Sequence, residues 1–135
     1  MGLKDILSRE GDLTLSDLQE FQRIYDDRFV AKKGFVGFDK VRHTYAHMGK
    51  LIGRLADYVH DMEESPEKAS GEDIRTKVIP DLLVYCAWLA NEFEVKMDES
   101  YLGRMVGNLK RLYSKGVSSE EMTQIEHAVN KKIKD

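Results

Sequence analysis

The sequence has a single cysteine, only two prolines and no excess of basic residues. With Cys86 alone the chain can form no internal disulfide and no cysteine-based metal site, and we expect a buried, inert thiol. Two prolines in 135 residues impose few breaks on helices. The formal net charge of -3 gives no general basic field, so we expect no DNA partner.

Long apolar runs are missing as well. No stretch of about 18 apolar residues occurs, so we expect no membrane-spanning helix and no membrane partner. Residues 1–10 alternate charged and apolar side chains, unlike a signal peptide, which favours a cytoplasmic location. A composition of 41% hydrophobic and 33% charged residues is typical of a globular chain, and this length suits one domain.

Helical periodicity dominates what is present, and no strand-like alternation of any length appears. We predict an all-α, four-to-five-helix bundle that forms an oligomer, as a single domain over 1–135. Its core helices lie within about 16–115, and a C-terminal helix spans about 119–133. The predicted helices are Leu3–Ser8, one that begins with a capping box at Ser16, Asp39–Glu64, one capped by Ser70 that carries Ile74 to Leu89, Glu99–Lys115 and Ser119–Ile133.

The helix over Asp39–Glu64 has two distinct faces. An apolar seam with alternating steps of four and three predicts either a core face or a helix-pairing face. The seam consists of Val41, Tyr45, Met48, Ile52, Leu55, Val59 and Met62. The opposite face is either exposed to solvent or a cationic wall towards a pocket or an anionic ligand. It carries His43, His47, Lys50, Arg54 and Asp57.

The next helix is apolar nearly all round from Ile79 onward, so we expect it to be the most buried. Pro80 removes one backbone hydrogen bond and predicts a kink near 76–80. Tyr85 and Trp88 on this helix are candidates for stacking on a base, although aromatic residues at helical spacing are more often core.

Three segments, in order, resemble the MazG-like all-α nucleotide pyrophosphohydrolases. Gly53-Arg54-Leu55-Ala56-Asp57 is similar to the Gly-Glu-Leu-Ala-Glu stretch of that family. Asp81-Leu82-Leu83-Val84-Tyr85, followed by Leu89-Ala90-Asn91-Glu92, resembles Asp-Val-Leu-Ile-Tyr and Leu-Ala-Asp-Glu. Arg104-Met105-Val106-Gly107-Asn108-Leu109-Lys110-Arg111 resembles Lys-Met-x-x-Asn-x-x-Arg. The likeness covers roughly residues 15–113.

The resemblance implies cleavage of a nucleoside triphosphate to the monophosphate and pyrophosphate, with magnesium held by four carboxylates on two helices. Its registers place those carboxylates at Leu51, Arg54, Val78 and Asp81, of which only Asp81 is acidic. One carboxylate does not hold magnesium well without substrate phosphates, so magnesium is a doubtful cofactor here. We expect Arg54 to take the place of the cation and to pair with Asp81.

The resemblance also implies phosphate contacts from Arg104, Asn108 and Arg111, which share one helix face, and we add Arg54 and Lys50 as phosphate-binding candidates. The alternative for the first three is a solvated basic stripe. If catalysis survives, Asp81 and Asp57 are the candidate catalytic residues. His43 and His47, at i and i+4, are a speculative transition-metal pair with Asp57 or Asp81 as a third ligand.

Three functions follow as hypotheses. The first is a protein of the MazG-like family that binds a nucleotide or another phosphorylated small molecule, with weak or absent hydrolysis. The second is an active but divergent nucleoside triphosphate pyrophosphohydrolase, and the third is a noncatalytic helical scaffold. Because two helices carry more apolar surface than one small bundle covers, we predict a homodimer or tetramer built on them.

Overall fold

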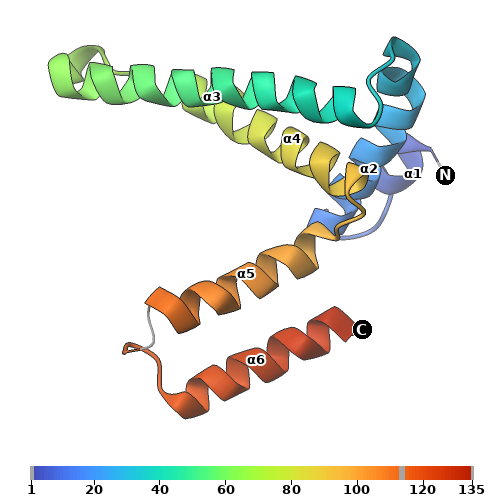
Figure 1. Ribbon diagram of the computed structural model, residues 1–135, viewed down its shortest axis with the longest axis vertical. Helices are drawn as coiled ribbons and strands as arrows, with labels where there is room; N and C mark the ends of the chain where they lie inside the picture. Colours follow the sequence, from blue (N-terminus) through green and yellow to red (C-terminus); the bar gives the residue numbers. More distant parts are fainter. Residues whose placement is uncertain (1, 113–114, 135) are drawn as a thin grey trace. The chain divides into compact units, whose positions relative to one another are not determined.

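The computed structural model describes residues 2–112 and 115–134, which form helices, turns and loops and contain no strand. The predicted all-α class is therefore confirmed for this part of the chain. Its contacts divide the chain into two compact units, one over 1–94 and one over 95–135 (Figure 1).

The first unit is built on three α-helices and a short N-terminal one. A non-helical stretch, 8–14, joins the first two helices, and short π-helical and 3-10 segments contribute to the later connections. The helices are α1 (Leu3–Leu7), α2 (Leu15–Tyr25), α3 (Phe38–Glu64) and α4 (Ile79–Glu92), and the connecting segments are Asp26–Val30, Ala31–Lys33, Pro66–Lys68 and Ile74–Val78.

The N-cap of helix α2 lies two residues before the predicted one. Thr14, not Ser16, is the N-cap: its hydroxyl accepts the backbone N–H of Asp17 at 3.1 Å. Asp17 in turn accepts the backbone N–H of Thr14 at 2.9 Å and pairs with Arg9. Both arrangements fit the capping spacing, and the earlier one leaves Asp17 free to pair also with Arg9.

Helix α3 has nearly the predicted bounds. Two glycines with positive φ end the preceding segment, Gly34 at 81° and Gly37 at 55°, and Gly37 is the N-cap. Positive φ strains any residue with a Cβ, which explains glycine at both positions. Helix α3 then runs for 27 residues, about 40 Å, beside α4 (Figure 1).

Helix α4 follows a π-helical turn, Ile74–Val78, and carries Pro80 in its first turn. The change of helix type lies where Pro80 predicted a kink, because proline cannot continue the regular hydrogen-bond ladder. The expectation that this helix would be the most buried is only partly right. Ala87, Trp88 and Ala90 are buried, but four large apolar residues and Cys86, which we expected to be inert and buried, are exposed; the four are Ile79, Leu82, Leu83 and Val84.

The two faces of α3 are arranged differently from the simplest interpretation of the sequence. Lys40, Thr44 and Leu51 are the buried residues of α3, whereas the apolar seam is largely open: Tyr45 is 80% and Ile52 66% exposed. The seam is therefore not the core of this unit. The face expected to be solvated or to line a pocket is the one packed towards α4, through ring contacts of His43 and His47.

The second unit is a helical hairpin of α5 (Met97–Leu112) and α6 (Ser119–Lys134). An ion pair joins Lys110 to Glu126 across it, and α6 begins at the capping serine that the sequence predicts, since the Ser118 hydroxyl accepts the backbone N–H of Glu121 at 3.1 Å. Helix α5 begins two residues before the predicted Glu99. Its predicted last turn includes residues 113–114, which lie outside the described part of the chain.

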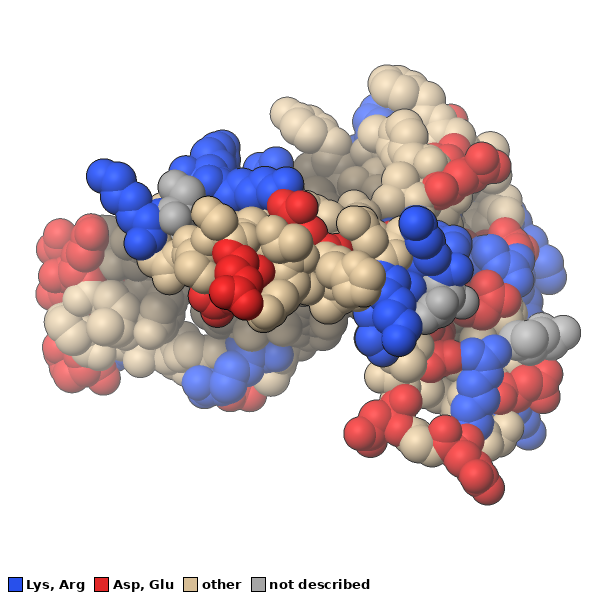
Figure 2. Space-filling view, turned by 90° about the horizontal axis from the view of Figure 1, so that it is seen from below, with Lys and Arg blue, Asp and Glu red and all other residues tan. Residues whose placement is uncertain are grey.

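Among the described helices, none combines the length and the apolar character that crossing a membrane requires. On the face seen in Figure 2, acidic and basic side chains are interspersed with uncharged surface rather than gathered in one basic field.

Candidate functional site

A row of aromatic rings lines the contact between α3 and α4. On α3, the His43 and His47 ring centroids are 4.2 Å apart, with the rings tilted by 41°. Across the contact, His43 lies 5.4 Å from Trp88 and His47 lies 5.4 Å from Tyr85. Phe35, from the loop before α3, extends the row with its centroid 4.5 Å from His43. All except Trp88 are half-buried, so the row presents ring surface to solvent.

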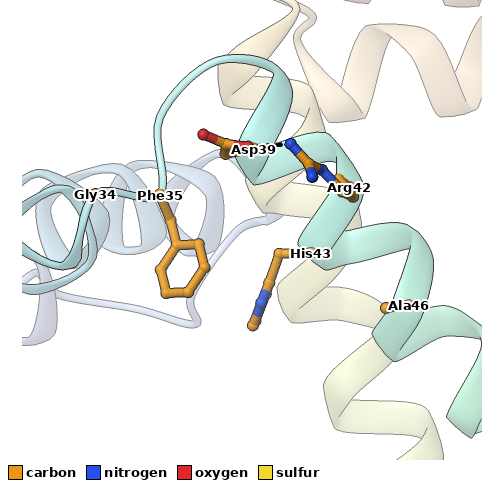
Figure 3. Close-up of a pocket in the computed structure, with 6 residues that line it drawn as sticks. All are labelled: Gly34, Phe35, Asp39, Arg42, His43 and Ala46. Carbon is orange, nitrogen blue, oxygen red and sulfur yellow. Dashed lines mark hydrogen bonds and ion pairs between the residues drawn. The ribbon is translucent and has the colours of Figure 1, made fainter.

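At the Phe35 end of the row lies an open hollow of about 340 Å³ (Figure 3). Phe35 and His43 project side by side into it, while Arg42 and Asp39 are paired with each other above them. Burial lowers the pKa of His43 below its ordinary value, and the charges of His47 and Lys50 act in the same direction. This lowering of the pKa favours the uncharged His43 ring, which suits stacking on a planar group.

Beneath the rings, a buried ion pair anchors the start of α3. Lys40 Nζ lies 3.3 Å from Asp26 Oδ2 and 3.9 Å from Glu92 Oε2, and it also lies over the Trp88 ring at 5.5 Å. Gln22 donates a 2.7 Å hydrogen bond to Asp26. Burial raises the pKa of Asp26, because desolvation outweighs the lowering by Gln22 and Lys40.

The ion pairs of Lys40 link three helices at the end of the aromatic row. Asp26 follows α2, Lys40 is on α3 and Glu92 is on α4, so the ion pairs fix the distances between the helices that carry the rings. The Trp88 indole N–H is buried and has no hydrogen-bond partner. Neither Asp26 nor Lys40 was identified as a functional residue from the sequence. The only hint of the buried pair in the sequence is that Lys40 precedes Thr44 by one helical turn and so lies on the same side of α3.

Arg54 marks the other end of the α3 face. Its Nη1 is buried without a hydrogen-bond partner. The side chain borders a second hollow of about 250 Å³, and its charge contributes to lowering the pKa of Asp73, after the larger effect of Lys77. Four carboxylates line this hollow together with Arg54 and Lys68, so it is acidic on balance; they are Asp57, Asp61, Glu72 and Asp73.

The predicted pair of Arg54 with Asp81 is wrong, because no ion pair within 4.0 Å joins them in the described part of the chain. Asp81 is half-buried on α4, where its charge adds to burial in raising the pKa of Tyr85. Arg54 lines instead the hollow that is also lined by Asp73.

The residues at the implied magnesium positions do not fit that ion. Leu51 is 3% and Val78 1% exposed, so hydrocarbon fills two of the four positions and Arg54 takes a third. Magnesium requires oxygen ligands, and only Asp81 could offer them. Among the described residues, no group of three or more His, Cys, Asp or Glu is placed to hold a metal ion. His43 and His47 adjoin each other but have no third ligand of these types in that part of the chain.

The remaining phosphate-binding candidates lie on separate elements. Lys50 is exposed on α3, between His47 and Arg54. Arg104 and Arg111 are exposed on α5 and Asn108 is half-buried there, all in the second unit. Their role in binding phosphate stays a prediction.

Comparison with known proteins adds no relative: no family model, no curated protein and no solved structure matches this chain. The likeness to MazG-like proteins therefore rests on the three short segments of sequence alone.

Proposed function

We propose that the protein binds a nucleotide, or another phosphorylated molecule with a planar ring, along the α3 face that runs from His43 to Arg54. In this proposal it is a divergent MazG-like protein whose hydrolysis is weak or absent. The carrying observation is the half-exposed row of rings on the same helix face as a guanidinium with an unpaired, buried N–H.

The rings supply the stacking surface. Phe35, His43, His47 and Tyr85 expose part of their faces, and a planar base gains from offset stacking on such groups. The hollow beside Phe35 and His43 gives a ring room to enter.

Arg54 supplies the phosphate contact. A buried N–H without a partner costs about 1–3 kcal/mol, so an acceptor that reaches it is favoured. A guanidinium binds phosphate oxygens with two parallel hydrogen bonds. Arg54 follows His47 by seven residues, about 10 Å along the helix, so one elongated ligand can span both groups. Lys50 lies between them and adds a second positive charge.

The proposal of weak or absent hydrolysis follows from the shortage of carboxylates that could hold magnesium. The family chemistry that the sequence resembles needs several carboxylates around magnesium, and Leu51, Val78 and Arg54 stand at three of those positions. The carboxylates near Arg54 would repel a bare triphosphate, so we expect a ligand with few phosphates to bind better than one with three when no divalent cation is present.

The test is a calorimetric titration of the full chain with a nucleoside and its mono-, di- and triphosphates, each with magnesium and with a chelator. We expect binding of at least one phosphorylated form. Arg54→Gln should weaken it by about 10- to 100-fold, the equivalent of 1.5–3 kcal/mol for a charged hydrogen bond, and leave nucleoside affinity unchanged. Arg28→Gln, an exposed arginine of the same unit, is the matched control.

Two outcomes would decide against the proposal, and one variant extends it. No heat with any of these ligands would contradict the proposal and favour the helical scaffold. Release of pyrophosphate that requires magnesium and is lost in Asp81→Ala would instead identify an active pyrophosphohydrolase. The double variant Arg104→Gln/Arg111→Gln shows whether the α5 motif contributes to the affinity for phosphate.

A further inference from the structure

Within the first unit, helix α3 leaves its apolar seam uncovered. Five seam residues of α3 are exposed, and Met48 is half-buried between them. The five are Tyr45, Ile52, Leu55, Val59 and Met62. From Tyr45 to Met62 the seam steps by three and four residues in strict alternation, the repeat with which one helix packs against another in a coiled coil.

The residues that flank the apolar seam on one side have unusually small side chains. Gly49 and Gly53, four residues apart, are both exposed, and a Cβ added at either would meet nothing within 4 Å. Ala46 and Ala56 continue this side. Glycine in a helix interior is destabilising, and nothing within the unit packs against these two. Small residues beside an apolar seam allow the backbone of another helix to come close.

Charge along α3 is divided by sign. Residues 38–54 contain four Lys or Arg and one Asp, whereas residues 55–64 contain four Asp or Glu and no Lys or Arg. Lys40 is buried, and Lys50 and Arg54 lie on the opposite face. Arg42 and Glu63, however, are exposed beside the seam, and a second α3 lying antiparallel would bring these two opposite charges together. The antiparallel arrangement also opposes the two helix dipoles, which relieves the acidic last turn of each helix.

We propose that two copies of this chain associate through an antiparallel α3–α3 contact. One register aligns Tyr45 with Met62, Met48 with Val59 and Ile52 with Leu55 of the second copy. Within two residues of that register, the flanking side places Gly49 beside Ala56.

The same flanking side places Arg42 beside Glu63 of the second copy. Each pairing occurs twice in the dimer, because the two-fold axis repeats it.

The area is sufficient for a specific dimer. A large apolar side chain that is about half exposed presents on the order of 100 Å², so the five residues present on the order of 500 Å² per copy. Two copies bury on the order of 1,000 Å² from the seam alone, which reaches the lower limit of a specific interface before the flanking residues are added.

Charge exchange tests both the contact and its register. Sedimentation velocity of the full chain should show a species of twice 15.5 kDa at micromolar concentration. Arg42→Glu and Glu63→Arg should each weaken dimerisation by about tenfold or more, because like charges then face each other twice. The double variant should restore it. Arg28→Glu, remote from α3 in sequence, controls for the change in net charge.

A steric variant gives an independent measurement. Gly49→Leu should favour the helix itself yet abolish the dimer, whereas Gly107→Leu, at an equally open helical glycine of α5, should not affect it. A wild-type chain that stays monomeric at 100 μM would overturn the proposal and indicate that another part of the chain, or a different partner, covers the seam. A dimer insensitive to both charge reversals and to Gly49→Leu would overturn it equally, since its contact would lie elsewhere.

Discussion

Replacing Lys40 by methionine should destabilise the first unit strongly and in a pH-dependent way. The Asp26 and Lys40 side chains are only 6% and 9% exposed, so each charge depends on the other. Removing one partner of a buried pair typically costs about 3–5 kcal/mol, because the remaining charge is left without compensation. Methionine keeps the length and apolar stem of lysine, so the loss reports mainly on charge.

Protonation of Asp26 sets an upper limit to the stability that Lys40→Met can lose. Instead of staying charged, Asp26 can take up a proton, which costs 1.36 kcal/mol for each pH unit above its ordinary pKa of 3.8. That limit is about 4 kcal/mol at pH 7 and about 1.6 kcal/mol at pH 5. We therefore expect Lys40→Met to lower the free energy of unfolding by about 3–4 kcal/mol at pH 7 and by less than half of that at pH 5.

Urea unfolding followed by circular dichroism, at both pH values and a fixed protein concentration, measures this difference. In Lys40→Met/Asp26→Asn neither charge is buried, and stability should return to within about 1 kcal/mol of the wild type. Lys77→Met, from an exposed pair with Asp73, should cost less than about 1 kcal/mol at either pH. A loss that is independent of pH, or a double variant no more stable than Lys40→Met, would refute the reasoning.

Two further predictions concern the same unit. Because the pKa of His43 is lowered in the folded chain, protonation of its ring opposes folding below pH 6.5; the melting temperature of His43→Gln should therefore rise relative to that of the wild type as pH decreases from 7.5 to 5.5, and His60→Gln controls for the loss of an imidazole. Thr14→Ala removes the cap of α2 and should lower the free energy of unfolding by about 0.5–2 kcal/mol, whereas Ser16→Ala should have a smaller effect; an equal loss in both variants would contradict the assignment of Thr14 as N-cap.

The helices of this protein could be predicted from sequence because period and capping are local properties. The predicted Asp39–Glu64 differs from α3 by one residue, and Ser119–Ile133 differs from α6 by one. The cap of α2 was misplaced because two capping spacings overlap in its sequence. The contact of Asp17 with Arg9, eight residues earlier, lies beyond what a local pattern registers.

The site was predicted less completely, for a different reason. Hydrophobicity predicted that the seam from Val41 to Met62 is either a core face or a helix-pairing face, and α4 packs on the other face, which carries His43 and His47. Trp88 and Tyr85 provide ring partners for these histidines, which a periodicity pattern cannot anticipate. The pairing of Asp26 with Lys40 depends on how α2 meets α3, a tertiary property with no local signature.

The division of α3 into a ring face and an apolar seam makes the two proposals separable. Ile52 belongs to the seam and lies on a different side of the helix from His47 and Arg54, since successive residues advance by about 100° around it. Ile52→Asp should therefore abolish the dimer, because it places two charges at the centre of the contact, and leave ligand affinity unchanged. Arg54→Gln should do the reverse. If Ile52→Asp removed ligand binding while circular dichroism showed an unchanged fold, the ligand site would require both copies and the assignment of binding to one α3 face would be wrong.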